Sequence, residues 1–293
     1  MEKLIDKQRV VQHMNGRLLR NNVLKFLFFL ATLFGLIVLV VLLYRILTQA
    51  LGWLNMDFLN NFPSRRPEKA GIKAGLVGSL WLMVIVAPVS LILGVGTAIY
   101  LEEYAKKNRF TDFIQTNISN LAGVPSIVFG LLGLTLFVRE LNLGRSILAA
   151  GLTMSLLVLP VIVVAAQEAL RAVPNQLREA SYGMGATKWQ TIYRIVLPAA
   201  IPGILTGSIL ALSRAIGETA PLVVLGIPTF LAYLPRGILD TFTVMPMQIY
   251  NWTSRPQADF QHVAAAGIVV LLVVLILMNS IAIFIRNKFQ KRY

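Results

Sequence analysis

The sequence has 293 residues, of which 56% are hydrophobic and 14% charged, with a formal net charge of +14. A soluble domain of this length needs more charged residues to cover its surface, so the composition predicts an integral membrane protein. The chain has no cysteine, which excludes disulfides, thiolate metal sites and cysteine nucleophiles. Its basic residues lie between apolar runs rather than in one tract, so the charge indicates membrane topology and not nucleic-acid binding.

Six apolar stretches long enough to span a membrane follow one another along the chain. The first comes after a basic segment, residues 1–25, and no small-residue cleavage site follows it. We expect an uncleaved span rather than a secretory signal, because its helical length of about 28 Å matches the hydrocarbon layer. The six predicted spans are 26–44, 74–101, 113–138, 146–167, 198–220 and 264–285.

Helix breakers interrupt three of these stretches. Pro88 and Pro160 lie inside the second and the fourth, and the third contains Gly-Val-Pro-Ser at 123–126. A membrane tolerates such breaks where neighbouring helices or a cavity satisfy the freed backbone groups. The breaks therefore predict that these spans line a pathway. A further apolar segment, 221–233, is too short and too broken to span, so we expect it to be re-entrant or interfacial.

Lys and Arg are more frequent in the segments on the same side as both chain ends than in the segments on the other side. The positive-inside rule then predicts that both termini are cytoplasmic. In this topology residues 1–25 form a cytoplasmic N-terminal segment, residues 26–285 the six-helix transmembrane domain, and residues 286–293 a cytoplasmic tail. The polar loop between the fourth and fifth spans also lies on the cytoplasmic side.

That loop contains a polar stretch, EASYGMGATKWQTIYRIVLP, at 179–198. Small and apolar residues recur here at three- and four-residue spacing: Leu177, Ala180, Ser181 and Met184. The spacing predicts a short helix within about 177–190. Gly185 is expected to end it, because glycine readily takes the left-handed backbone of a helix C-terminus. Residues 189–196 then turn back toward the membrane, which makes a helix-turn-helix outside the bilayer; an amphipathic helix on the lipid surface is the alternative.

The stretch resembles the EAA motif of ABC importer permeases. The matching residues are Glu179, Ala180, Ser181, Gly185, Ile195, Leu197 and Pro198. In that family the motif forms a cytoplasmic coupling helix, which docks in a groove of a separate ATPase subunit. The resemblance implies an all-α membrane protein with six transmembrane helices and the type I ABC importer permease fold. Ser181 stands where the family has alanine, and it is small enough to pack in the same groove.

Nothing in the sequence indicates that the chain carries out chemistry itself. It contains no GxxxxGK[ST] phosphate loop, so any ATP that is used must bind to another chain. Its two histidines, His13 and His262, fall short of a metal-ligand set. We expect no catalytic, cofactor or metal site in this chain.

Two charged residues, Arg214 and Glu218, lie in the otherwise apolar fifth span. A charge there costs at least a few kcal/mol on insertion scales, so the pair is a candidate functional site. Their four-residue spacing places them on one helix face, where they could also form no more than a structural ion pair. Counted from Ala199, Arg214 lies roughly 22 Å along the helix, in the outer half of the hydrocarbon layer. Pro221 is expected to end the helix near the external surface.

An Arg–Glu pair suits phosphate better than sulfate. The planar guanidinium fork matches two oxygens of a tetrahedral oxyanion. Near neutral pH inorganic phosphate keeps at least one P–OH group that can donate to a carboxylate, whereas sulfate has none. The pair therefore favours inorganic phosphate as the substrate.

The segment RAIGETAPL, residues 214–222, resembles the corresponding span of the PstA-type permeases of phosphate-specific ABC importers. The resemblance implies a multi-pass subunit in the lipid of a bacterial inner membrane, which moves inorganic phosphate by alternating access while a partner hydrolyses ATP. The implied partners are a PstC-like permease in a heterodimer, two PstB-like ATPase subunits and a PstS-like phosphate receptor. Arg171 matches a further arginine of the family. For Arg171, a role in the substrate pathway and a role as a positive-inside residue are equally open.

Two other functions are compatible with the sequence. One is a permease for sulfate, molybdate or phosphonate, which differs only in its substrate. The other is a secondary anion carrier, but such carriers usually show internal repeats with broken helices at matching positions, and we see none in this sequence.

Overall fold

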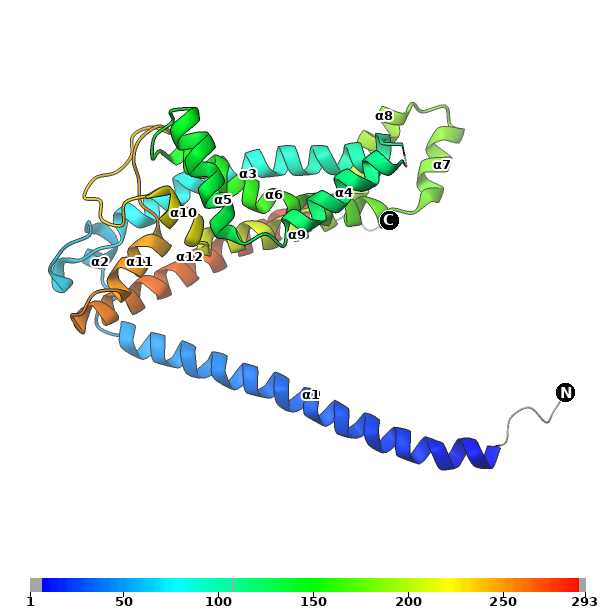
Figure 1. Cartoon of the computed structure of the whole chain (residues 1–293), viewed down its shortest axis with the longest axis horizontal. Helices are drawn as coiled ribbons and strands as arrows, with labels where there is room; N and C mark the ends of the chain where they lie inside the picture. Colours follow the sequence, from blue (N-terminus) through cyan, green and yellow to red (C-terminus); the bar gives the residue numbers. More distant parts are fainter. Residues whose placement is uncertain (1–6, 107, 290–293) are drawn as a thin grey trace.

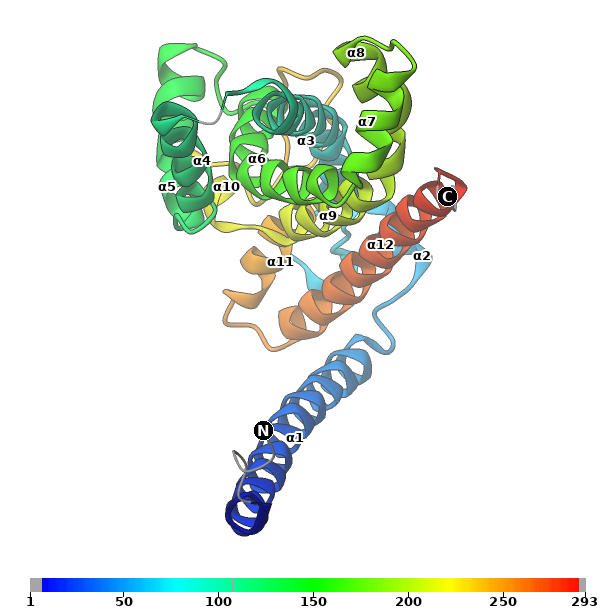
Figure 2. The ribbon, with the colours of Figure 1, turned by 90° about the vertical axis from the view of Figure 1, so that its right-hand side faces the viewer.

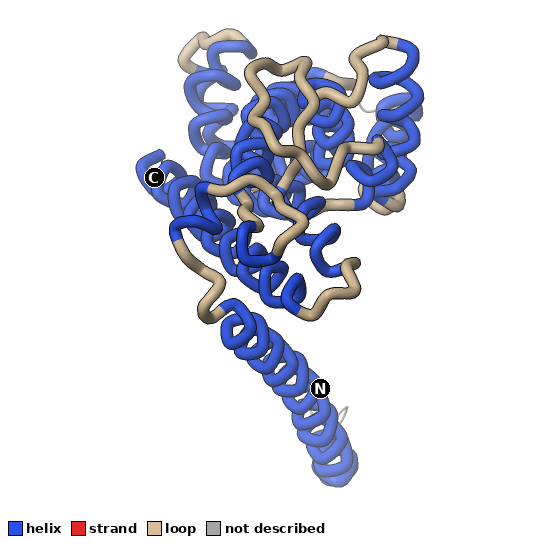
Figure 3. Tube along the Cα trace, turned by 90° about the vertical axis from the view of Figure 1, so that its left-hand side faces the viewer, coloured by secondary structure: helices blue, strands red, loops and turns tan. Residues whose placement is uncertain are grey.

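The computed structural model describes residues 7–106 and 108–289. Residues 1–6, Lys107 and residues 290–293, which belong to the predicted cytoplasmic segments, lie outside the described residues. In the described part every named element is a helix or a helical turn, as Figure 3 shows. The prediction of an all-α protein is confirmed.

Five helices are long and apolar enough to cross a membrane, and two shorter helices joined at a bend of 103° make a sixth candidate span if the bent pair crosses as one unit. The five long helices are α1 (Lys7–Ala50), α3 (Lys73–Ile99), α6 (Ile147–Arg171), α9 (Leu197–Gly217) and α12 (Asp259–Phe289). The bent pair consists of α4 (Arg109–Leu121) and α5 (Ser126–Gly133), and α5 continues as the π-helical turn η3 (Leu134–Glu140).

Short elements gather at the two ends of the bundle (Figure 1). One end carries α7 (Asn175–Gly183) and α8 (Lys188–Thr191), close to the end of α12, and the opposite end carries α2 (Met56–Asn60) and α11 (Met245–Thr253). The other short elements are η1 (Pro67–Lys69), η2 (Tyr100–Tyr104), η4 (Ile192–Val196) and α10 (Ala220–Leu225). The predicted docking segment thus lies at one tip of the molecule.

The helix breakers act in different ways. Pro88 and Pro160 lie inside the continuous helices α3 and α6. The Gly-Val-Pro-Ser segment at 123–126 instead separates α4 from α5, so the third predicted span is broken rather than kinked. Proline disfavours a helical backbone in the residue before it and cannot donate to the helix ladder, which explains a break at this combination with glycine.

The fifth span also differs from the sequence prediction. We expected one helix to contain both charged residues and to end at Pro221, but α9 ends at Gly217 and Glu218 has an extended backbone, with φ −76° and ψ 123°. The reason is that a proline ring in a helix clashes with the carbonyl four residues earlier. For Pro221 this carbonyl belongs to Gly217, the last residue of α9, so Pro221 favours a helix end here, although α3 and α6 accommodate Pro88 and Pro160 without ending. Pro221 lies instead in the first turn of α10.

The bundle core forms where α3, α6 and α9 pack together. Val86 of α3 lies in one buried cluster with Met154 and Val158 of α6. α6 and α9 approach closely, because a Cβ added at Gly207 would lie 2.3 Å from the Cβ of Ala165. Small residues at such contacts are typical of membrane helices, since they let the backbones pack by van der Waals contact.

Helix α1 leaves the bundle and diverges from it, as Figures 1 and 2 show from two sides. The C-terminal end of α1 joins the bundle, where Ala50 is fully buried and α1 packs against α12. There the Gln49 carbonyl lies 2.9 Å from Nδ1 of His262, and Trp53 stacks on the same imidazole ring. The apolar side chains farther from this junction are exposed in the single chain.

The first turn of α11 and the loop before it are held against the first half of α3. The Met245 N–H donates to Ser79 Oγ at 3.0 Å, and the Gly75 N–H donates to Gln248 Oε1 at 3.1 Å. Gly78 lies between these contacts, and a Cβ added there would stand 1.9 Å from the carbonyl oxygen of Thr243. The two backbones therefore meet at a distance that only glycine allows.

We expect Gly78→Ala to destabilise the protein by at least about 1–3 kcal/mol, because the added methyl group forces the Thr243 backbone away. Gly96→Ala is the matched control, since Gly96 lies in the same helix with nothing within 4 Å of its added Cβ. Thermal unfolding of the detergent-purified variants measures the difference. Equal melting temperatures for the two variants would contradict this account of the contact.

Candidate transport pathway and docking hairpin

Arg214 lies in the last turn of α9, at a crevice between three parts of the chain. The crevice is lined by Leu121, Ala122, Val124, Leu157, Val158, Val161, Ala211, Arg214 and Ala215. These residues come from the bend between α4 and α5, from α6 and from α9. Arg214 is the one charged residue among them, and its side chain is 71% exposed. A guanidinium thus stands at the edge of an otherwise apolar crevice.

Glu218 faces Arg214 across the end of α9. Its Oε2 lies 3.9 Å from Nε of Arg214, and its side chain is 19% exposed. This separation is longer than a hydrogen bond, so the contact is a loose ion pair. The two residues are brought together as predicted, although Glu218 reaches Arg214 from extended backbone and not from the same helix. A loose pair leaves the guanidinium fork able to bind an oxyanion.

Two helix breaks meet near this pair. The bend between α4 and α5 lines the crevice, and α9 breaks at Glu218 before α10 begins. The segments that follow the breaks pack on each other, since a Cβ added at Gly130 of α5 would lie 2.8 Å from Cα of Pro221 in α10. Non-helical backbone inside a membrane domain occurs where it is buried in protein or lines a cavity, and broken helices often form substrate sites.

The position of Arg214 along the bundle follows from its neighbours on α6. Val158 lies about 16 Å from the start of α6 at Ile147 and about 20 Å from its end at Arg171, at 1.5 Å per residue. Arg214 is therefore near the middle of the bundle, slightly toward the end where α6 begins.

The polar stretch 179–198 folds as the predicted helix-turn-helix. Helix α7 ends at Gly183, and Gly185 takes the left-handed backbone with φ +81°. The Gly185 N–H donates to the Tyr182 carbonyl at 2.9 Å, and the Ala186 N–H donates to the Ser181 carbonyl at 3.2 Å. This pair of bonds is the Schellman motif that closes a helix with glycine.

We call the segment from α7 through η4, residues 175–196, the docking hairpin, after the role that the sequence predicts for it. Its second arm begins at α8 with a capping box between Thr187 and Gln190, and α8, η4 and α9 continue as one apolar helical stretch, Lys188–Gly217. Ile195 belongs to η4, while Leu197 and Pro198 begin α9. The motif residues after Gly185 thus return the chain into the bundle.

The two arms of the docking hairpin are joined by a buried hydrogen bond. Ser181 Oγ and Thr191 Oγ1 lie 2.9 Å apart, and both residues are buried. Serine at a position where the family has alanine therefore adds a polar contact instead of weakening the hairpin. The role of Thr191 could not be predicted from the sequence, because its ten-residue separation from Ser181 matches no helical periodicity.

The outer surface of the docking hairpin is rich in exposed apolar and aromatic side chains. Glu179 and Ala180 are exposed. Met184 is 79% exposed, and Trp189 and Tyr193, each 61% exposed, stack on each other. Exposed apolar side chains gathered at one tip of a molecule are typical of an interaction surface.

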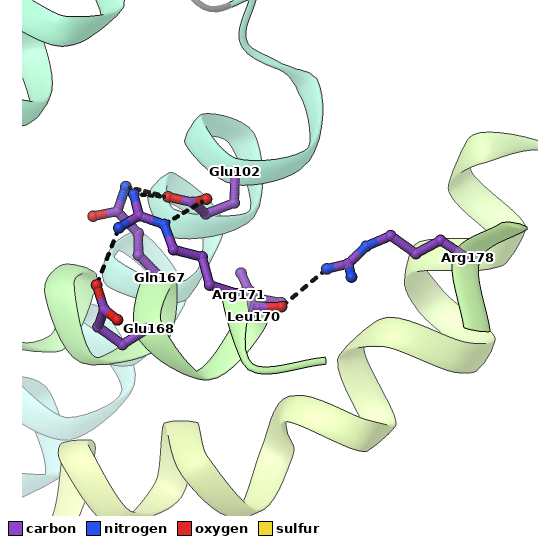
Figure 4. A network of polar contacts seen from close by, with 6 residues as sticks. All are labelled: Glu102, Gln167, Glu168, Leu170, Arg171 and Arg178. Atoms are coloured by element: carbon purple, nitrogen blue, oxygen red, sulfur yellow. Dashed lines mark hydrogen bonds and ion pairs between the residues drawn. The ribbon is translucent and has the colours of Figure 1, made fainter. Parts of the chain in front are cut away.

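Arg171 lies at the end of α6 near the docking hairpin, in the network of Figure 4. Its Nε and Nη2 donate to the two carboxylate oxygens of Glu102 at 2.9 and 2.6 Å. Its Nη1 donates to Glu168 at 3.0 Å. The structure does not bring Arg171 together with Arg214, because about 20 Å of α6 separates it from Val158 beside the crevice.

The contacts of Glu102, Glu103 and Arg178 were likewise not predicted from the sequence. Glu103 and Arg178 form an ion pair of 2.8 Å with side chains that are 8% and 16% exposed. The sequence shows two adjacent carboxylates, Glu102 and Glu103, directly after an apolar span. It does not indicate which arginines bind them.

Comparisons with known proteins agree with this fold. The family "Binding-protein-dependent transport system inner membrane component" matches residues 90–293. "Phosphate transport system permease protein PstA 1" of Mycobacterium tuberculosis (strain H37Rv) is 37% identical over 88% of this chain and 85% of its own. "Probable ABC transporter permease protein YqgI" of Bacillus subtilis is 32% identical over 87% of this chain and 91% of its own.

Among solved structures, a chain of a bacterial ABC transporter that imports the acidic polysaccharide alginate superposes with a TM-score of 0.59. The match covers 94% of this chain and all of that one at 19% identity, which supports the type I importer permease fold. The chain therefore belongs to the family of binding-protein-dependent transport system inner membrane components, the permeases of ABC importers, and to its PstA-type branch.

Proposed function

We propose that this chain is the PstA-type permease subunit of an ATP-driven importer of inorganic phosphate. Arg214 carries the proposal, because its exposed guanidinium stands where two helix breaks meet near the middle of the bundle. A charge at such a position is costly in a membrane and is retained where it serves an ion pathway. The PstA relatives at 37% identity support phosphate as the anion.

In this function the Arg214 fork binds two oxygens of phosphate, and Glu218 accepts a hydrogen bond from a P–OH group. Their loose contact of 3.9 Å allows an anion to take up donors of the guanidinium without first breaking a tight pair. The pathway opens alternately to the two sides of the membrane. Sulfate would meet only repulsion at Glu218, since it has no proton to donate near neutral pH.

The proposed assembly contains a PstC-like permease, two PstB-like ATPase subunits and a PstS-like receptor. The docking hairpin, with Glu179 and Gly185, binds the ATPase on the cytoplasmic side of the inner membrane, and both chain termini lie on that side. ATP is bound and hydrolysed by the partner. The exposed apolar side chains of the docking hairpin support this contact.

A role of Arg171 in the pathway is a second proposal. Its side chain is 43% exposed near the end that carries the docking hairpin, where a phosphate ion would leave the pathway. Phosphate would then have to replace Glu168, whose own side chain is 67% exposed, at the guanidinium. The test measures phosphate uptake in Arg171→Gln and in Glu102→Gln at a normal level of the complex. Glu102→Gln removes the charge of the other carboxylate bound to Arg171 but keeps the guanidinium. The role is supported only if uptake falls more in Arg171→Gln than in Glu102→Gln.

The test of the main proposal is uptake of radiolabelled phosphate into cells that carry or lack this chain, with unlabelled sulfate, molybdate and phosphonate as competitors. We expect uptake to depend on the chain and to resist these competitors. Purification through a tag on this chain should retrieve an ATPase that phosphate-loaded receptor stimulates. Uptake of another oxyanion would reassign the substrate, and transport without any ATPase would indicate a secondary carrier.

A further inference from the structure

Helix α3 continues directly into the π-helical turn η2, Tyr100–Tyr104, which ends where the Ala105 N–H donates to the Tyr100 carbonyl. Successive side chains of a helix point about 100° apart, so neighbours in sequence reach different surroundings. In η2 the neighbours Glu102, Glu103 and Tyr104 contact three different elements. Single π-helical turns of this kind are frequent at functional sites.

Glu102 binds the end of α6. Besides the two bonds from Arg171, its Oε1 accepts a bond of 3.1 Å from Nε2 of Gln167, and Gln167 is only 3% exposed. Figure 4 shows that all three side chains converge at the end of α6. A two-pronged Arg–carboxylate contact fixes geometry as well as distance. This contact therefore holds η2 and α6 in one register.

Glu103 binds the first arm of the docking hairpin. Its Oε1 accepts from Nη2 of Arg178 at 2.8 Å and from Nε at 3.3 Å. Arg178 also donates to the carbonyls of Val173 and Leu170, at 2.7 and 2.9 Å, and Figure 4 shows the second of these bonds. These carbonyls lie in the last turn of α6 and just after it, where the regular helical donor four residues on is missing. Arg178 thus ties α7 to two spans at once.

Tyr104 contacts the second arm. The Lys188 Nζ lies 5.1 Å from the centre of the Tyr104 ring, at the start of α8. A cation at this distance over an aromatic face is attracted to the ring. Three consecutive residues of one turn therefore contact α6, α7 and α8.

We propose that η2 is the mechanical link through which a movement of the docking hairpin reaches the transmembrane helices. The inference rests on the proposed ATPase contact of this hairpin. The route continues through α3, which packs against α6 along its length, and α6 supplies Leu157, Val158 and Val161 to the crevice of Arg214. Glu103 and Arg178 are positioning residues in this route, because they touch neither substrate nor nucleotide.

The Glu103–Arg178 pair is the best point for a test, since it is the least exposed ion pair among the described residues. Removing one partner of a buried pair leaves the other charge uncompensated. Glu103→Gln keeps the size of the side chain and a hydrogen-bond acceptor but loses the charge. Glu168→Gln is the matched control, because Glu168 is largely exposed and bonds only within its own helix.

The experiment uses the intact importer complex in proteoliposomes and compares basal ATP hydrolysis with hydrolysis stimulated by phosphate-loaded receptor. For Glu103→Gln we expect the stimulation to fall about tenfold, a size typical of coupling between sites. Basal hydrolysis and the amount of bound ATPase should stay within about twofold of wild type. The double variant Glu103→Gln/Arg178→Gln should lose less stimulation than the sum of the losses in the two single variants, because both substitutions remove the same ion pair.

Full stimulation in Glu103→Gln would overturn the proposal. Loss of the ATPase from the purified complex would also overturn it, since the pair would then serve assembly alone. Amide hydrogen exchange of residues 175–196 gives a measure that does not depend on the substrate, and it should become faster in Glu103→Gln but not in Glu168→Gln. Unchanged exchange would contradict the link, whereas a wild-type complex that ignores phosphate-loaded receptor would contradict only the proposed substrate.

Discussion

Arg214→Ala is expected to abolish phosphate uptake while the complex assembles at its normal level. The substitution removes the counter-charge of the anion and leaves the Glu218 carboxylate to repel it. Each hydrogen bond to a charged group contributes about 1.5–3 kcal/mol, so loss of a two-pronged contact predicts a decrease of at least about a hundredfold. The fold should survive, because the Arg214 side chain is 71% exposed and its pair with Glu218 is loose.

The measurement is phosphate uptake in membranes where the amount of complex is checked by purification. Arg214→Lys should keep the charge but transport poorly, since an ammonium group lacks the planar fork. Arg236→Ala, an exposed arginine in the loop between α10 and α11, is the matched control and should transport normally. Wild-type uptake in Arg214→Ala would mean that Arg214 and Glu218 are only a structural ion pair.

Gly185→Val is expected to reduce transport strongly by distorting the docking hairpin. Gly185 has φ +81°, and no other group lies within 4 Å of its added Cβ, so the cost comes from the backbone and not from a clash. A β-branched residue in a left-handed backbone costs about 1–2 kcal/mol, which the chain can avoid by opening the Schellman turn. The surface that meets the ATPase would then lose its shape.

Gly183 provides a close control for this prediction. It lies two residues earlier at the end of α7, also with open space around its added Cβ, but with a helical backbone. Gly183→Val should therefore assemble with the ATPase and transport far better than Gly185→Val. Uptake and ATPase retention together measure the effect. Normal values for Gly185→Val would indicate that the hairpin is a surface loop without a docking role.

Sequence patterns sufficed for the features that depend on local chemistry. The apolar stretches predicted the membrane spans, because the length of a charge-free helix is set by the hydrocarbon layer itself. The EAA stretch predicted the helix-turn-helix and the left-handed Gly185, because glycine alone takes this backbone at little cost. Pro221 indicated that the fifth helix ends but not where, because Pro88 and Pro160 lie inside continuous helices and a proline alone does not fix the last residue of a helix.

Contacts between distant segments were decided only by the tertiary structure. Glu102 and Glu103 are adjacent in sequence, yet one binds Arg171 and the other Arg178, and no local rule selects between bases about seventy residues away. The same holds for the crevice, where the bend after α4 comes to lie beside Arg214. The sequence by itself determined that a charge within the fifth span must face protein or water, because exposing it to lipid is costly. Which segments border Arg214, whose side chain is 71% exposed in the single chain, depends on how α4, α6 and α9 pack, and that packing is a property of the whole bundle.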